Sequence, residues 1–146
     1  MPDTPETILA FDFGLRRIGV AVGQRITASA TPLCVVRNGD AGPDWDTIAE
    51  LVRDWTPARI VVGMPVNADD TPSRITRRVQ DFVSELARFS LPVETEDERY
   101  SSREAGALLK AGRAGGRRRR IGKGDIDSAV AMLIAERWLA RNPPRN

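Results

Sequence analysis

Histidine is absent from this 146-residue chain, and cysteine occurs once, as Cys34. Without histidine, Ser-His-Asp and Cys-His nucleophilic catalysis and any histidine-ligated metal are excluded. A single cysteine excludes an internal disulfide and a multi-cysteine zinc site. Any chemistry must therefore use carboxylates, hydroxyls, amines, the one thiol or a cofactor.

Long apolar runs are also missing. None approaches the roughly 18–20 residues that a membrane span needs, and the polar, acidic start MPDTPET lacks the basic and apolar parts of a secretory signal. We therefore expect a cytoplasmic protein with no membrane partner. The length suits one domain with its own core, so we expect a single domain over residues 1–146.

Positive charge is concentrated in one segment. Residues 110–123 (KAGRAGGRRRRIGK) hold seven of the 22 lysines and arginines and none of the 20 acidic residues. The rest of the chain then has 15 basic and 20 acidic residues, a net charge of −5. Basic clusters attract phosphate backbones through counterion release, without reading sequence. The alternative interpretation is a solvated loop that only aids solubility.

The hydrophobic pattern changes period along the chain. The predicted elements are strands over 7–13, 17–23 and 26–36, a helix over 44–55, a strand over 59–66, a helix over 71–90, a strand over 91–98, and helices over 101–112 and 125–142. Short connections between the first three strands are typical of antiparallel hairpins. The later strand–helix alternation predicts a mixed α/β sheet with helices on its faces.

One acidic residue, Asp12, interrupts the apolar first strand of the chain. Aspartate is depleted in strands, and an ionised carboxylate is costly to bury unless it is paired or bound to a metal. Further acids lie at the end of another predicted strand, at Asp97 and Glu98, and in the first turn of the last helix, at Asp127. Strand ends and helix starts converge at one edge of an open α/β sheet. Carboxylates gathered there would repel one another unless a cation such as Mg²⁺ or Mn²⁺ joined them.

Each acid also has a purely structural interpretation. Asp127 could support the first turn of its helix through the dipole, although Asp125 is the predicted N-cap there. Glu98 could form a loop salt bridge. We predict that Glu94 and Glu96 are solvated strand residues.

Four motifs carry a family resemblance: LAFDFGLRRIGVAVG, VVGMPVN, DERYSS and IDSAVAMLI. In order and spacing they resemble the YqgF/RuvX-like family, whose members are described as Holliday-junction-resolvase-like proteins and as pre-16S rRNA nucleases. The resemblance covers about residues 8–140. It implies an RNase H-like fold with a mixed five-stranded sheet and helices on both faces. It also implies a Mg²⁺- or Mn²⁺-dependent nuclease in which Asp12, Glu98 and Asp127 bind the metal and are catalytic.

The implied substrate is structured nucleic acid, with processing of the 5′ end of pre-16S rRNA in ribosome biogenesis as the expected role. The predicted nucleic-acid-binding residues are Arg16, Arg17, Arg113, Arg117, Arg118, Arg119, Arg120 and Lys123. Arg16 and Arg17 could instead cap the hairpin turn. Leu15 and Arg16 depart from the family pattern, in which a Thr or Ser and a Lys usually follow DFG, and this departure concerns substrate contacts more than the acids.

Three other functions compete with this prediction. A Holliday-junction resolvase would act on branched DNA, and symmetric cleavage would call for a homodimer. A non-catalytic protein that binds RNA or a transcription complex would not need to gather acids near its ligand. The hairpin DFGLRRIGVA also resembles the phosphate-binding hairpin of actin-like ATPases and sugar kinases, but those need two lobes and this chain has room for one.

Overall fold

The computed structural model describes residues 6–64, 74–97 and 123–143. Their strands form one five-stranded sheet in the order β3-β2-β1-β4-β5. The strands are β1 (Thr7–Phe13), β2 (Arg17–Gln24), β3 (Ser29–Arg37), β4 (Arg59–Met64) and β5 (Val93–Asp97). β1, β2 and β3 are antiparallel neighbours, whereas β4 pairs in parallel with both β1 and β5. This is the predicted mixed five-stranded sheet.

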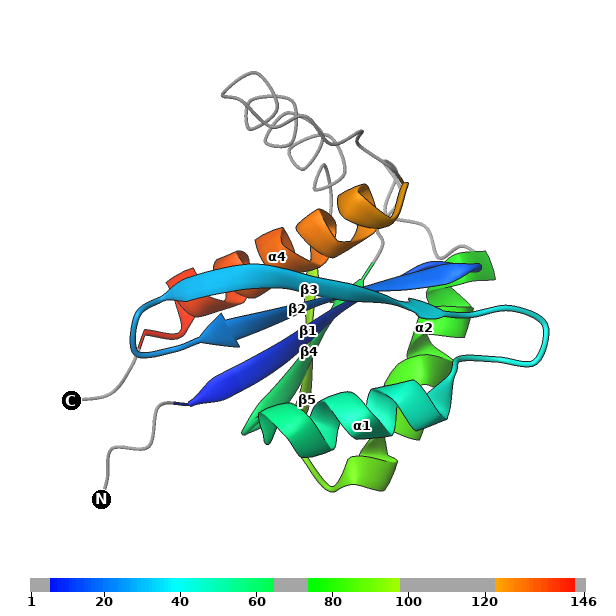
Figure 1. Ribbon diagram of the computed structural model, residues 1–146, viewed down its shortest axis with the longest axis horizontal. Helices are drawn as coiled ribbons and strands as arrows, with labels where there is room; N and C mark the ends of the chain where they lie inside the picture. Colours follow the sequence, from blue (N-terminus) through cyan, green and yellow to red (C-terminus); the bar gives the residue numbers. More distant parts are fainter. Residues whose placement is uncertain (1–5, 65–73, 98–122, 144–146) are drawn as a thin grey trace.

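Helices cover both faces of the sheet (Figure 1). The helix α1 (Trp45–Trp55), the helix α2 (Arg74–Glu85) and the short 3₁₀ turn η1 (Leu86–Phe89) lie on one face, and the long helix α4 (Lys123–Arg141) lies on the other. No helix within the described ranges is long and apolar enough to cross a membrane.

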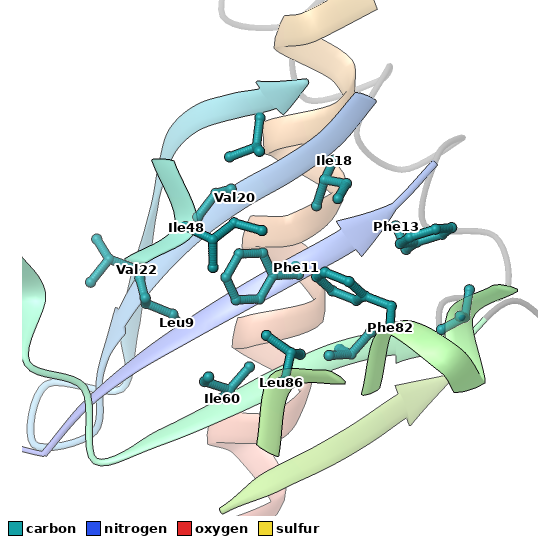
Figure 2. Close-up of a cluster of buried hydrophobic side chains, with 13 residues drawn as sticks. Leu9, Phe11, Phe13, Ile18, Val20, Val22, Ile48, Ile60, Phe82 and Leu86 are labelled. Carbon is teal, nitrogen blue, oxygen red and sulfur yellow. The ribbon is translucent and has the colours of Figure 1, made fainter. Parts of the chain in front are cut away.

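The alternation in β1 divides the core into two layers. Leu9, Phe11 and Phe13 belong to the cluster under α1 and α2, whereas Ile8 and Ala10 belong to the cluster under α4. Figure 2 shows Phe11 and Phe13 gathered around Phe82 of α2, with the Phe11 and Phe82 rings edge to face at 5.8 Å. The two faces of β1 therefore contribute to two separate layers of the core.

Several predicted boundaries are wrong. The strand predicted over 91–98 begins at Val93, and the helix predicted over 71–90 is α-helical only to Glu85 and continues as η1. The third strand begins at Ser29 rather than Ile26, because residues 25–28 form a turn in which Ala28 has a left-handed φ of 53° and its amide donates to the Arg25 carbonyl. The last helix begins at Lys123, so Asp125 lies inside it and is not its N-cap. The helix predicted over 101–112 and residues 71–73 of the helix predicted over 71–90 lie outside the described residues.

Candidate metal and nucleic-acid site

Asp12 is the second-last residue of β1 and faces α4. Its cross-strand partners are Gly19 in β2 and Gly63 in β4. Successive side chains of a strand alternate between faces, so Asp12 shares the α4 face with Ile8 and Ala10. Asp12 is half-buried at the carboxyl edge of the parallel strands, which is where open α/β sheets place their ligands.

Gly19 is the residue that lets α4 approach this edge. A Cβ atom placed on it would lie 2.0 Å from the carbonyl oxygen of Asp127 and 2.9 Å from the amide nitrogen of Ser128. Only glycine allows such backbone contact. Because directly paired residues in antiparallel strands have Cα atoms about 4.5–5.5 Å apart, this contact brings the Asp127 segment beside Asp12.

Asp127 is held by an ion pair with β2. The Arg17 Nε donates to Asp127 Oδ2 at 2.8 Å, with 41% of the Arg17 side chain and 23% of the Asp127 side chain exposed. Arg17 lies two residues before Gly19, so its side chain is on the same face of the sheet. On the helix face that continues from Asp127, Ala131, Ile134 and Trp138 are buried.

The turn between β1 and β2 borders the site and is tied down by Asn38. The Asn38 side chain is buried, and its Nδ2 donates to the Gly14 carbonyl at 2.7 Å. Its backbone amide donates to the Arg16 carbonyl at 3.0 Å. Leu15 (46% exposed) and Arg16 are thus presented to solvent on a fixed turn.

The third predicted ligand, Glu98, lies outside the described residues, immediately after β5 in the sequence.

The prediction that Glu94 and Glu96 are solvated strand residues is wrong. Glu96 is buried at 7% exposure and pairs with Arg141, and Glu94 pairs with Arg59 and accepts a hydrogen bond from the Trp138 Nε1 at 3.1 Å. Both side chains are on the α4 face, and α4 supplies a partner to each, Trp138 to Glu94 and Arg141 to Glu96.

Some of the other predicted site residues lie within the described residues and some lie outside them. Among the predicted nucleic-acid contacts, the structure describes Arg16 and Arg17; the side chain of Lys123 and the residues Arg113, Arg117, Arg118, Arg119 and Arg120 fall outside it. No group of three or more Asp, Glu, Cys or His side chains that could hold a metal is found among the described residues. The structure therefore brings Asp12 and Asp127 to one edge and leaves the position of Glu98 untested.

The one thiol is not at this site. Cys34 is half-buried in β3, where burial raises the pKa of its thiol above 9.0. A raised pKa reduces the thiolate fraction and hence the reactivity. Carboxylates are therefore the titratable groups that the described part of this site offers.

Sequence reasoning missed Gly19 and Asn38. A glycine inside a strand often marks close backbone approach, so the signal for Gly19 was present in RIGVAVG. Nothing in the sequence around Asn38 points to the turn that it holds, because its partners Gly14 and Arg16 are more than 20 positions away.

Solved structures with a similar fold include the RuvC protein of T. thermophilus bound to a Holliday junction substrate. The two chains share 15% identity over 93% of this chain and 95% of that one, with a TM-score of 0.53. A second Thermus thermophilus RuvC structure gives a TM-score of 0.51 at 15% identity, over 92% of this chain and 95% of that one. The fold is thus that of the RuvC-like resolvases, an RNase H-like fold.

Sequence comparison defines the family more closely. The family model described as "RuvX: Holliday junction resolvase" matches residues 6–141. A protein of Azotobacter vinelandii named "Putative pre-16S rRNA nuclease" is 45% identical over 95% of this chain and 96% of its own length. One of Shewanella oneidensis with the same name is 43% identical over 91% of this chain and 93% of its own. The chain belongs to the RuvX family, as predicted, and these relatives support a nuclease function.

Proposed function

We propose that this protein is a divalent-metal-dependent nuclease that hydrolyses phosphodiester bonds in structured nucleic acid, with the 5′ end of pre-16S rRNA as its substrate. The family and the names of the relatives support the nuclease class and the RNA substrate. The observation that carries the proposal is the meeting of Asp12 and Asp127 on one face at the carboxyl edge of the sheet. A protein of this role would work in the cytoplasm.

The donor set suits a hard cation. Asp12 and Asp127 offer only oxygen ligands, and the guanidinium of Arg17 already occupies one Asp127 oxygen, so this carboxylate binds a cation in the protein as it stands. Mg²⁺ and Mn²⁺ are the metals that carboxylates suit. We infer that Asp12, Asp127 and Glu98 hold the ion. When bound, such an ion activates water and stabilises the leaving oxygen of a phosphodiester.

The arginines beside the acids would position the substrate. Arg16 is exposed on the fixed turn that follows Asp12, and guanidinium groups bind phosphate oxygens in bidentate pairs. The basic segment over 110–123 directly precedes and enters α4 in the sequence. We infer that it contacts phosphates of the same substrate and so adds affinity without sequence specificity.

A second candidate substrate is a four-way DNA junction. The description of the matching family favours it, since that description names a Holliday junction resolvase. Cleaving such a junction symmetrically needs two sites, so this activity would require a homodimer.

The test is a cleavage panel with two substrates, a pre-16S rRNA leader fragment and a synthetic four-way DNA junction, with Mn²⁺ or with EDTA. Wild type should cleave the RNA in Mn²⁺ alone, and Asp12→Asn should stay folded without cleaving. Cleavage of the junction by a dimer, with intact RNA, would favour the second candidate. Retention of RNA in EDTA without cleavage in Mn²⁺ would indicate a non-catalytic binder and overturn the nuclease proposal.

The basic segment has its own test. Replacing Arg117, Arg118, Arg119 and Arg120 by glutamine should flatten the plot of log K against log salt. The slope should fall by about 0.9 for each phosphate that the segment no longer neutralises on duplex DNA, or by about 0.7 on a single strand. An unchanged slope would show that the segment does not touch phosphate.

A further inference from the structure

The Arg17–Asp127 ion pair differs from the other arginine contacts of the α4 face. Arg17 uses its Nε on one carboxylate oxygen at 2.8 Å and keeps 41% of its side chain exposed. Arg25 donates to Glu6 and to the Asn142 carbonyl with its side chain only 17% exposed. Arg141 is more exposed, at 64%, but its partner Glu96 is buried, whereas 23% of the Asp127 side chain is exposed. The Arg17–Asp127 pair therefore combines an exposed arginine with a carboxylate that a ligand can reach.

The partner of Arg17 is also unusual, because it is a residue assigned above to cation binding. A guanidinium and a divalent ion that share one carboxylate repel each other because both are positively charged. The repulsion energy decreases with their separation and with solvent screening. Phosphate is the alternative partner that a guanidinium binds best. Substrate bound at the edge of the sheet would bring phosphates to this position.

We propose that Arg17 is an exchangeable counter-ion of Asp127. In the metal-free protein it neutralises the carboxylate; a divalent ion displaces it; and the released guanidinium then binds a phosphate of the nucleic acid. Arg17 thus sets an order of binding, in which the metal ion binds before the nucleic acid. This inference rests on the proposed function, because it takes Asp127 as a metal ligand.

The proposal makes the phosphate contact of Arg17 conditional on metal. Arg16, its neighbour, is exposed, and the structure gives it no carboxylate partner among the described residues. Any phosphate contact that Arg16 makes should therefore be equally strong with and without metal. This pair of adjacent arginines provides a matched control.

The first experiment titrates Mn²⁺ alone into wild type, Arg17→Gln, Arg17→Lys and Arg16→Gln by calorimetry. An exposed ion pair contributes at most about 1 kcal/mol, so Arg17→Gln should bind Mn²⁺ about threefold to fivefold more tightly than wild type. Arg17→Lys, which keeps the charge, and Arg16→Gln should match wild type. Unchanged or weaker Mn²⁺ binding by Arg17→Gln would overturn the counter-ion role.

The second experiment measures binding of a fluorescein-labelled RNA stem-loop by stopped-flow anisotropy, before turnover, in EDTA and in Mn²⁺. Arg17→Gln should match wild type within about twofold in EDTA and weaken RNA binding by about fivefold or more in Mn²⁺. Arg16→Gln should weaken binding by the same factor in both. An Arg17→Gln effect that is equal in both conditions would contradict the exchange.

Asp127→Asn separates this inference from the proposed function. If wild type binds Mn²⁺, Asp127→Asn does not, and Arg17→Gln binds no more tightly than wild type, the metal site stands and the counter-ion role fails. If wild type and Asp127→Asn bind Mn²⁺ equally, both the metal assignment of Asp127 and the exchange are wrong.

Discussion

Both ends of β2 contact α4 through a glycine and an arginine, but the contacts of these residues differ between the two ends. Near its start, Gly19 admits the α4 backbone and Arg17 pairs with Asp127. Near its end, Gly23 faces the side chain of Leu139, and Arg25 lies over the Trp138 ring at 5.4 Å while pairing with Glu6.

The second end, which we call the anchoring end, contains Glu6, Arg25, Arg59, Glu94 and Trp138. Arg59 pairs with both Glu6 and Glu94 and also lies over the Trp138 ring at 5.4 Å, and the indole donates to Glu94. Each of these charges has at least two partners from other parts of the chain. The difference teaches that charge on the α4 face is structural where partners are shared, or where the carboxylate is buried as in Glu96. It is available for ligands where a partly exposed carboxylate, Asp127, pairs with an exposed arginine.

The largest difference should be in catalysis. Asp12→Asn and Asp127→Asn should each lower the cleavage rate in Mn²⁺ by more than about 100-fold, because even residues that only support metal ligands cost about 10–100-fold. Glu94→Gln, at the anchoring end, should stay within about threefold of wild type. Single-turnover rates on the rRNA leader measure this. A comparable loss in Glu94→Gln, with the fold intact, would remove the distinction between the two ends.

The two glycines should differ in stability. In Gly19→Ala the new methyl would strike the α4 backbone, whereas in Gly23→Ala it would meet the Ile8 and Leu139 side chains at 2.9 and 3.2 Å. Overpacking costs typically about 1–3 kcal/mol, so Gly19→Ala should lose about 3 kcal/mol of unfolding free energy and Gly23→Ala about 1 kcal/mol. Urea denaturation measures both. Equal losses would show that α4 yields as easily at the site as at its other end.

The exposed apolar residues of the two turns give a smaller contrast. Leu15 (46% exposed) lies on the turn beside the site, and Ile26 (59% exposed) lies on the turn after β2. Covering half a leucine side chain contributes about 1 kcal/mol, so Leu15→Ser should weaken RNA binding about fivefold if bases contact this turn. Ile26→Ser should not change it. Equal effects in fluorescence anisotropy would place the substrate elsewhere.

The smallest effect should be on acid stability. The hydrogen bond from the Trp138 indole, together with the hydrogen bond and charge of Arg59, lowers the pKa of Glu94 below its usual 4.5, against an opposing contribution from burial. A depressed folded-state pKa adds stability above pH 4.5 that is lost as the pH falls through the lowered value. Glu94→Gln should therefore lose less than about 1 kcal/mol at pH 7, since the carboxylate is partly exposed.

The same variant should flatten the fall of stability below pH 4.5. Thermal melts at about pH 7, 5, 4 and 3 measure it. A fall with pH as steep in Glu94→Gln as in wild type would show that this carboxylate is not coupled to folding.

Periodicity was enough to predict the sheet and most of its helices. The two-residue alternation of Leu9, Phe11 and Phe13 against Ile8 and Ala10 in the sequence corresponds to the two core layers on either side of β1. Boundaries failed where local geometry decides, as at Ala28, whose left-handed turn starts β3 three residues later than predicted.

The site was only partly predictable, because its details depend on pairing across the chain. Asp12 stood out as an acid in an apolar strand, but the ion pair of Asp127 joins residues 110 positions apart. Glu96 was misjudged for the same reason: it is buried and its partner Arg141 is 45 positions away. The choice of Glu98 came from family resemblance alone and stays a prediction.

A Mn²⁺ titration tests most directly whether Asp12 and Asp127 bind one divalent ion. Electron paramagnetic resonance of the free ion measures how much Mn²⁺ remains unbound. Wild type should bind Mn²⁺, Asp12→Asn and Asp127→Asn should each lose at least about tenfold in affinity, and Glu6→Gln at the anchoring end should bind as wild type. Equal binding by all four proteins would contradict the account.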